Sequence, residues 1–156
     1  MKTRSVMNDR YFKEKGFSIS TDTAVFDRDY LFAQLKQTYW ATDLTREVFD
    51  RSVENALCFG IFQGRKQLGF ARVITDKATF AYLADVFVDA EFRGQGLGKW
   101  LVQTILAHPD LQGLRRLLLV TADAHTLYAQ FGFSPVDKPE NYMTKRHHRA
   151  TEEVLL

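Results

Sequence analysis

The sequence is poor in cysteine, and it contains no long apolar run. Cys58 is the single cysteine among 156 residues, so no disulfide can form within the chain, and we expect a reducing, cytoplasmic compartment. Its thiol lies in the apolar run 57–62, where a cysteine is more often a small core residue than a nucleophile. No run reaches the roughly 20 apolar residues that span a bilayer, and the first residues lack the apolar stretch of a secretory signal. We therefore expect no membrane partner.

Metal-binding patterns and a strong charge bias are also missing. The pair His147-His148 is adjacent rather than at the spacing of metal ligands, and the sequence contains no other cluster of cysteine and histidine. The formal net charge is only +2, whereas a dedicated nucleic-acid binder concentrates basic charge on one face. We expect no metal and no nucleic-acid partner.

Proline is scarce too, with three residues that all lie after position 108. Nothing therefore divides the first two thirds of the chain, and the length suits one domain with its own core. We expect a loose polar lead-in over residues 1–15, a single domain over 16–146 and a short tail over 147–156.

Apolar periodicity predicts helices and strands in the first half of the chain. Residues 17–20 alternate between apolar and polar side chains, which favours a short strand. Helical spacing of apolar residues follows at 27–38, with Asp27 or Asp29 near the N-cap. A second helix is expected after Thr45. Three runs typical of strands, joined by short turns, lie at 57–62, 68–74 and 80–88. Such consecutive strands predict an antiparallel meander.

The second half of the chain has a different pattern. A helix is predicted over 97–105 and ends before Pro109, and the apolar run 117–120 is typical of a buried, often parallel strand. With the strand at 80–88, these elements form a strand–helix–strand crossover. The remaining expected elements are a short helix closed by a glycine and two further strands, at 124–131, Gly132, 133–136 and 142–146. The fold class is therefore α/β, of the α+β kind, with a mixed, mostly antiparallel sheet and flanking helices.

The turn between the strand at 80–88 and the following helix carries the clearest chemical signal. Gly94 and Gly96 remove side chains where the helix begins, which leaves backbone N–H groups free to point at an anion. Arg93 and Lys99 add positive charge beside them. The glycines alternate as G-x-G-x-G, which fits neither the dinucleotide fingerprint nor the Walker loop. We interpret the turn as a pyrophosphate cradle; the alternative is that the glycines only permit a tight turn and close packing.

The segment Arg93-Gly94-Gln95-Gly96-Leu97-Gly98 resembles the R/Q-x-x-G-x-G/A motif of the GNAT superfamily of N-acetyltransferases. The strand Asp85–Asp89 before it, and the later L-Y-x-x-x-G-F segment Leu127–Phe133, are also similar to that family. The order of these motifs covers nearly the whole chain. The resemblance implies a single domain whose central parallel strands splay apart, and an enzyme that uses an acyl-CoA, usually acetyl-CoA.

The resemblance also implies where the donor binds. Its pyrophosphate would sit on the N–H groups of the cradle, and its pantetheine arm would pair with the preceding strand like an additional strand. The residues implied for the donor are Val86, Phe87, Val88, Arg93, Gly94, Gln95, Gly96, Leu97, Gly98, Lys99 and Asp123. An N–H near Val88 would donate to the thioester carbonyl. Asp123 has the alternative role of capping the helix that follows it.

Two side chains are implied for the chemistry. Tyr128 matches the tyrosine that protonates the departing CoA thiolate, and a core aromatic at helical spacing is the alternative. The acceptor amine must be neutral to attack, although an amine with a pKa of about 10.4 is mostly protonated at pH 7. Asp85 is the nearest carboxylate to act as its base; the alternatives are a buried structural role for Asp85 and a water chain as base. Some relatives carry Glu where this chain has Ala84.

Tyr39, Trp40 and Arg46 lie in the joint between the two early helices, which forms one wall of the acceptor cleft in similar proteins. The aromatic pair could instead pack the two helices against each other, and Arg46 could be a surface charge. We expect direct transfer of an acetyl group to a primary amine of a small molecule, through a ternary complex and by a monomer or homodimer. The alternatives are a protein or peptide acceptor, and a regulatory CoA-binding module that has lost the chemistry.

Overall fold

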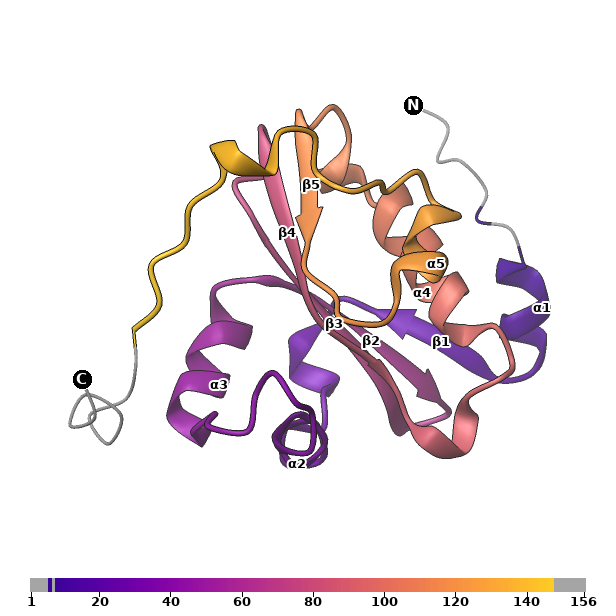
Figure 1. The fold of residues 1–156 in the computed structure, drawn as a ribbon. Coiled ribbons are helices and arrows are strands. Elements are labelled where there is room, and N and C mark those ends of the chain that lie inside the picture. Colours follow the sequence, from indigo (N-terminus) through magenta and orange to yellow (C-terminus); the bar gives the residue numbers. More distant parts are fainter. Residues whose placement is uncertain (1–5, 7, 148–156) are drawn as a thin grey trace. The chain divides into compact units, whose positions relative to one another are not determined.

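The computed structural model describes residue 6 and residues 8–147 of the chain (Figure 1). The chain divides into two compact units, one ending at Ala124 and the other beginning at His125. The first unit contains the sheet and the helices that pack on it, and the second contains one short helix. No helix within this described part is both long and apolar enough to cross a membrane.

The first unit is built on a five-stranded sheet with the strand order β1-β2-β3-β4-β5. The strands are β1 Phe17–Ser20, β2 Leu57–Gln63, β3 Lys66–Thr75, β4 Phe80–Val88 and β5 Arg116–Leu119. Strands β1 to β4 pair antiparallel, and β5 pairs parallel to β4. The predicted meander and crossover are confirmed. Tight turns force consecutive strands to pair antiparallel, whereas the helix after β4 carries the chain back to start a parallel partner.

Helices α2, α3 and α4 of this unit match the sequence prediction, whereas α1 was not predicted. The helices are α1 Asp9–Glu14, α2 Arg28–Lys36, α3 Arg46–Glu54 and α4 Leu97–Ala107, with 3-10 turns η1 Thr23–Val25, η2 Ala90–Phe92 and η3 Pro109–Leu111. The Asp27 carboxylate accepts the N–H of Tyr30 at 3.0 Å. The Thr45 hydroxyl accepts the N–H of Val48 at 3.3 Å. These caps fix the starts of α2 and α3, because they satisfy N–H groups that a helix leaves unpaired.

The lead-in expected over residues 1–15 is not loose in its described part, because it contains α1. Residues 1–5 and 7 lie outside the described residues. Phe12 stacks on Trp100 with 4.7 Å between ring centroids, and the Trp100 indole N–H donates to Asp9 at 3.2 Å. Phe12 is the buried residue of α1, and a single apolar side chain produces no helical period in a sequence. The helix depends on a partner 91 residues away.

The second unit confirms the short helix and its glycine stop. Its elements are α5 His125–Ala129 and the 3-10 turn η4 Pro139–Asn141. Gly132 has a φ of 89°, and the N–H of the next residue, Phe133, returns to the Tyr128 carbonyl at 3.3 Å. A left-handed residue followed by such a returning bond is a common way to end a helix.

The two last strands that the sequence suggests are wrong. Within the described residues, neither 133–136 nor 142–146 forms a strand. Pro135 lacks the N–H that a strand ladder needs. Of the tail expected over 147–156, only residue 147 lies within the described residues, so His148 of the histidine pair lies outside them.

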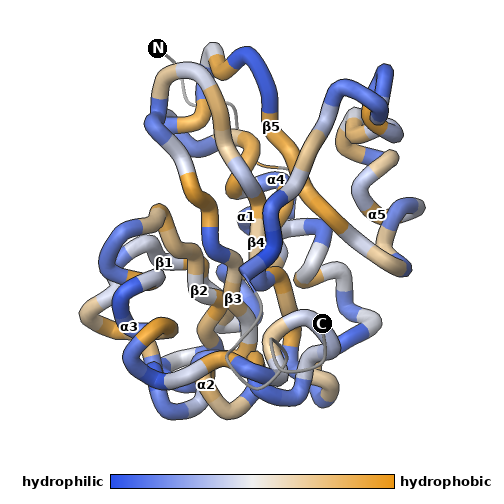
Figure 2. Tube along the Cα trace, turned by 60° about the vertical axis from the view of Figure 1, so that its left-hand side comes forward, coloured by the Kyte–Doolittle hydropathy of each residue, from blue (hydrophilic) through white to orange (hydrophobic). Residues whose placement is uncertain are grey.

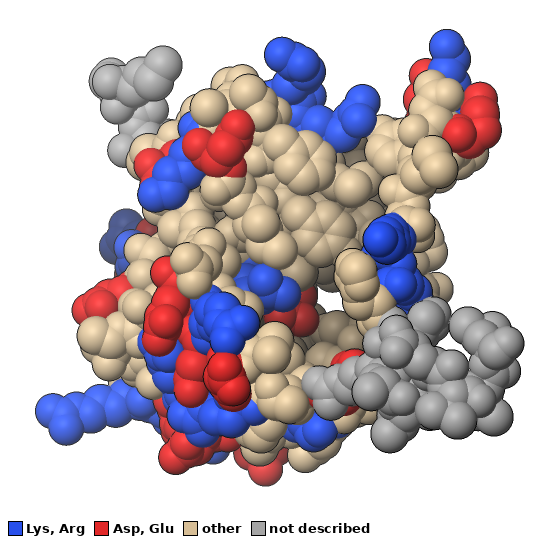
Figure 3. All heavy atoms as spheres, turned by 90° about the vertical axis from the view of Figure 1, so that its left-hand side faces the viewer, with Lys and Arg blue, Asp and Glu red and all other residues tan. Residues whose placement is uncertain are grey.

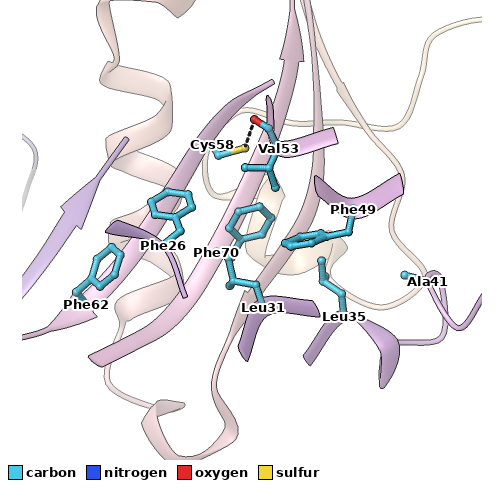
Figure 4. Close-up of a cluster of buried hydrophobic side chains, with 9 residues drawn as sticks. All are labelled: Phe26, Leu31, Leu35, Ala41, Phe49, Val53, Cys58, Phe62 and Phe70. Carbon is cyan, nitrogen blue, oxygen red and sulfur yellow. Dashed lines mark hydrogen bonds between the residues drawn. The ribbon is translucent and has the colours of Figure 1, made fainter. Parts of the chain in front are cut away.

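A hydrophobic cluster lies where α2 and α3 pack on β2 and β3 (Figure 4). Its buried members come from these elements and the segments beside them: Phe26, Leu31, Leu35, Ala41, Phe49, Val53, Cys58, Phe62 and Phe70. Cys58 is 1% exposed, and its thiol donates to the Val53 carbonyl at 3.8 Å. Burial raises the pKa of this thiol to about 11. The cysteine is therefore a packed residue that keeps its proton at neutral pH.

A buried amide joins α2 to the sheet. Gln67 of β3 is 3% exposed, and its Oε1 accepts the N–H of Asp27 at 2.7 Å. Its Nε2 donates to the Gly69 carbonyl at 3.3 Å. Because both ends of the amide have partners, its burial costs little. This contact sets the position of α2, the helix that leads to Tyr39 and Trp40.

Strand β5 is apolar after its first residue, Arg116 (Figure 2), but only partly buried. The sequence predicts a buried strand over 117–120, whereas Leu117, Leu118 and Leu119 keep intermediate exposure. Val120 is 79% exposed and lies beyond the end of the strand. The reason is position: β5 is an edge strand of the sheet, so only one of its sides has a strand neighbour.

We predict that Cys58 makes the folded chain sensitive to alkaline pH. The thiol ordinarily ionises with a pKa of 9.0, whereas in the folded chain its pKa is about 11. Between these values the unfolded state binds fewer protons. The contribution of the thiol to the free energy of unfolding therefore falls, by about 1.4 kcal/mol per pH unit. Urea denaturation of the native chain and of Cys58→Ala from pH 7 to pH 11 isolates this effect, because all other titrating groups are common to both. Parallel pH dependences would contradict the prediction.

Candidate active site

The loop from β4 to α4 is held at its start by hydrogen bonds to α2 and β3. The Tyr30 hydroxyl donates to the Asp89 carboxylate at 2.7 Å, and the Asp89 N–H donates to the Leu68 carbonyl at 2.7 Å. Burial and then the bond to Asp89 raise the pKa of Tyr30, and the same bond lowers the pKa of Asp89. Asp89 also accepts the N–H of Glu91 at 3.0 Å and so caps η2. The loop therefore leaves the sheet in a fixed direction.

Two positions of this loop require glycine because of their backbone conformation, and not because a Cβ would clash with a neighbouring atom. Gly94 and Gly96 have φ values of 81° and 87°, in the left-handed region. A Cβ on Gly94 would meet no atom within 4 Å, and one on Gly96 would lie 3.6 Å from Phe12. An L-residue in this conformation costs roughly 1–2 kcal/mol. Gly98 lies within the helix, and its Cβ would make an ordinary contact with Val88 at 3.9 Å.

The start of α4 presents backbone N–H groups without partners. The first N–H that returns to the helix is that of Trp100, which donates to the Gly96 carbonyl at 3.0 Å. In the described part of the chain, the N–H groups from Gly94 to Lys99 make no hydrogen bond. They stand at the positive end of an 11-residue helix, with the charges of Arg93 and Lys99 beside them. This arrangement fits an anionic group such as a diphosphate.

Strand β4 runs past the end of β5 and leaves a free edge (Figure 1). The parallel pairing ends at Leu83 and Leu119, whereas β4 continues to Val88. Residues 84–88 are half-buried, and on the side toward β5 they have no strand partner among the described residues. The edge ends at Val88, whose carbonyl accepts Arg93 Nε at 3.2 Å. The predicted splay of the parallel strands is thus present, and an extended chain with amide groups could pair with the free edge.

A β-bulge at Asp85 directs its side chain toward two donors. The register between β3 and β4 shifts between Phe70 and Arg72, and Asp85 has a φ of 55°. One carboxylate oxygen accepts Arg72 Nε at 2.9 Å, and the other accepts Trp40 Nε1 at 2.9 Å. The Arg72 and Asp85 side chains are 18% and 13% exposed. Asp85 therefore lies at the free edge as a paired carboxylate.

The aromatic pair Tyr39-Trp40 joins the free edge of β4 to the chain after β5. The Tyr39 hydroxyl accepts the N–H of Ala122 at 3.2 Å, while Trp40 donates to Asp85. The rings meet edge to face with 5.0 Å between centroids. Tyr39 remains 62% exposed and Trp40 45% exposed. The pair spans the point where β4 and β5 separate, and both residues are exposed.

Arg46 is engaged by carboxylates of α2 and α3. Its Nη1 lies 2.6 Å from Asp29, and its Nε lies 3.1 Å from Asp50. Arg28 reaches Asp50 at 3.2 Å. Figure 3 faces α3 and shows positive and negative side chains interleaved over this region. The bonds to Asp29 and then Asp50 raise the pKa of Arg46. An acceptor-binding role would require one of these ion pairs to open, so the arrangement favours a contact between the two helices.

The remaining predicted residues lie at and beyond the end of the first unit. Asp123 is exposed, and the Thr121 hydroxyl accepts the N–H of Ala124 at 3.0 Å, a contact of the kind suggested for Asp123. Within the second unit, Tyr128 is buried, and its ring lies edge-on to Phe133 with 5.8 Å between centroids. Among the described residues, no group of three histidine, cysteine, aspartate or glutamate side chains could hold a metal ion.

Three residues that position the site were not singled out by sequence reasoning. Tyr30 and Asp89 are 59 residues apart, and each fits its local pattern, one as a helix residue and the other as a turn residue. Arg72 does carry a signal, because a charged residue inside the apolar run 68–74 needs a partner when it is buried. Its partner cannot be read from spacing, since the hydrogen bond depends on the bulge in β4.

Known proteins resemble this chain in sequence and fold. A model of the acetyltransferase (GNAT) domain matches residues 54–135. A Gibberella zeae protein, named as an acetyltransferase without a stated acceptor, is 31% identical over 137 residues, covering 73% of this chain and 76% of that protein. A GNAT-family structure from Xanthomonas campestris pv. campestris has 47% sequence identity and a TM-score of 0.82, covering 84% of this chain and 93% of that one.

A GNAT-family acetyltransferase from Elizabethkingia anophelis with acetyl-CoA bound shares the fold alone. Its identity is 18% and its TM-score 0.61, with 78% of each chain covered. The domain match spans more than half of the present chain, and the relative at 31% identity spans about three quarters of both proteins. This chain therefore belongs to the GNAT family of acetyltransferases.

Proposed function

We propose that the chain transfers an acetyl group from acetyl-CoA directly to the primary amine of a small molecule, through a ternary complex. The observation that carries the proposal is a free strand edge at 84–88 and unpaired N–H groups at 94–99 within one unit. These features suit the two parts of a CoA, an amide-bearing arm and a diphosphate. The family supports acetyl as the transferred group, and the Elizabethkingia anophelis relative binds acetyl-CoA.

Specific groups of this chain would hold the donor. The N–H groups from Gly94 to Lys99, with the charge of Arg93, would hold the diphosphate. The main chain of residues 86–88 would pair with the pantetheine arm, and Asp123 is a further candidate contact for that arm. Bound acetyl-CoA supplies the activated acetyl group, and the protein supplies its orientation.

The buried thiol favours direct transfer over an acyl-enzyme. An acyl-enzyme needs a reactive nucleophile, and the thiolate is the reactive form of cysteine. Cys58 is 1% exposed, and burial raises its pKa to about 11, so it is neither accessible nor ionised at neutral pH. The amine therefore attacks while donor and acceptor are bound together. A C–N bond forms and a C–S bond breaks.

The transfer requires that one proton leave the amine and one reach the departing sulfur. An ammonium with a pKa of about 10.4 loses its proton at a cost of roughly 4–5 kcal/mol at pH 7. Asp85 stands at the free edge, but Arg72 and Trp40 already occupy its oxygens. A water-mediated route therefore suits the amine proton better than direct transfer to Asp85. We assign the proton for the sulfur to the Tyr128 hydroxyl.

We predict that release of CoA from acetyl-CoA requires a small primary amine. Free thiol is measured with purified protein, acetyl-CoA and a panel of small primary amines. Each amine's N,N-dimethyl analogue is the matched control, because it keeps the charge but cannot form a stable amide. Turnover with at least one primary amine and none with its analogue is expected. Turnover with peptides alone would move the acceptor to proteins, and CoA binding without any turnover would indicate a regulatory module.

We predict that Gly94→Ala weakens the affinity for CoA and that Gly113→Ala does not. Both glycines have positive φ, 81° and 72°, and at both a Cβ would meet no atom within 4 Å. The two variants should therefore lose similar stability, about 1 kcal/mol. Because only Gly94 belongs to the cradle, its variant should raise the dissociation constant of CoA about tenfold, as misaligned charge-assisted bonds do. Calorimetric titration with CoA measures this, and equal affinities would argue against a diphosphate site at this turn.

We predict that Tyr128→Phe lowers kcat by about 100-fold and leaves the KM for acetyl-CoA within about twofold. The substitution keeps the packing of the ring and removes the hydroxyl that would protonate the sulfur. Tyr11→Phe is the matched control, because Tyr11 is an exposed tyrosine of α1. Single-turnover measurements establish that chemistry limits the rate. An unchanged rate of chemistry in Tyr128→Phe would exclude Tyr128 as the acid.

A further inference from the structure

The Tyr39-Trp40 pair is held in place although its rings are exposed. The Tyr39 hydroxyl accepts the Ala122 N–H at 3.2 Å, and the Trp40 indole donates to Asp85 at 2.9 Å. An exposed aromatic side chain without such bonds would lose rotamer freedom when a ligand packs on it. Here both polar ends are already fixed while 62% and 45% of the two residues stay exposed. The pair is therefore a preorganised surface, and preorganisation lowers the entropic cost of binding.

Asp85 is placed to support Trp40. The carboxylate uses one oxygen for the indole and the other for Arg72 Nε, each at 2.9 Å. The Arg72 and Asp85 side chains are only 18% and 13% exposed, so removing either partner would leave the other charge unpaired in a largely desolvated place. The bulge at Asp85, with its φ of 55°, is what directs the carboxylate to both donors.

The charges around the pair favour a flat apolar group over a second cation. The carboxylate that Trp40 contacts is already paired with the Arg72 guanidinium, so it offers little net attraction to another ammonium. Tyr39 and Trp40 are 62% and 45% exposed, and aromatic side chains that reach the surface can make the stacked or edge-to-face contacts that aromatic groups prefer. The pair adjoins the free edge of β4, because Trp40 bonds the bulge residue of that strand.

We propose that Tyr39 and Trp40 form the specificity surface for the acceptor, and that this acceptor is a primary amine carrying an aromatic or flat apolar group. Asp85 and Arg72 are positioning residues that hold the indole. The inference rests on the proposed function, because the pair lies beside the strand edge assigned to acetyl-CoA.

Acetylation rates of related amines test the aromatic surface. CoA release is measured with 2-phenylethylamine, butylamine and 1,4-diaminobutane. The kcat/KM for 2-phenylethylamine should be about tenfold above that for either other amine. Trp40→Ala should abolish this preference by raising the KM for 2-phenylethylamine. Tyr11→Ala, which removes an exposed aromatic residue from α1, is the matched control and should keep the preference. A diamine preference in the native chain, or an aromatic preference that survives in Trp40→Ala, would overturn the proposal.

A double-mutant cycle tests the role of Asp85. Asp85→Asn should raise the KM for 2-phenylethylamine. In a Trp40→Phe background, the same substitution should not raise this KM further, because the indole N–H that Asp85 accepts is already absent. The acidic limb of the pH–rate profile should persist in Asp85→Asn. Loss of that limb together with an about 100-fold fall in kcat would identify Asp85 as the base and overturn its positioning role. Circular dichroism and thermal unfolding of each variant confirm that the fold is retained.

Binding without chemistry separates this inference from the proposed function. N,N-dimethyl-2-phenylethylamine should quench the fluorescence of Trp40 saturably, and Trp40→Phe subtracts the signal of Trp100, which is 1% exposed. Saturable quenching without CoA release from any primary amine would support the aromatic surface while contradicting the proposed function. Acetylation of amines without quenching would overturn the aromatic surface and leave the proposed function intact. Absence of both would overturn both.

Discussion

The pairing of β4 with β5 stops at Leu83 and Leu119, and the candidate active site depends on that stop. If β5 continued alongside β4, its backbone would satisfy the edge of residues 84–88, and no extended donor could pair there. An unpaired edge in a sheet is free to pair with another extended chain. The bulge at Asp85 lies on the same stretch and directs a carboxylate toward Trp40. The cradle at the start of α4 follows directly from the end of this edge.

Long-range hydrogen bonds connect the hydrophobic core to this site. Gln67 holds the start of α2 against the sheet, and Tyr30 on the same helix holds the loop that leads to the cradle. The chain after α2 then carries Tyr39 and Trp40 to the separated strands. The packing of α2 over the core therefore positions both the loop between β4 and α4 and the Tyr39-Trp40 pair. The hydrogen bonds of Gln67 and Tyr30 both require α2 to keep its position on the sheet. A change that displaces α2 should therefore affect both the stability of the fold and the candidate site.

Sequence patterns predicted most elements of the first unit and fewer of the remainder. The meander, α2, α3 and α4 were accessible because each buries a periodic apolar face or begins with a capping side chain. Helix α1 could not be predicted, because its single buried residue, Phe12, is buried by stacking on Trp100, which is distant in the sequence. The strands expected at 133–136 and 142–146 are absent from the described residues, because a short apolar run becomes a strand only beside another strand. The burial of β5 was overestimated because its place at the edge of the sheet is a property of topology.

The sequence by itself determined the glycine-rich turn before α4, the order of the strands and helices from β1 to β5, and the membership of the family. Left-handed glycines, helix caps and apolar periods act over a few residues, so they can be read directly from the chain. The tertiary structure alone decided that Asp85 pairs with Arg72 and Trp40, that Arg46 pairs with Asp29 and Asp50, and that Tyr39 reaches Ala122. Most of these partners lie far apart in the chain. Their contacts depend on strand register, on the bulge and on helix packing, which arise only when distant segments are brought together.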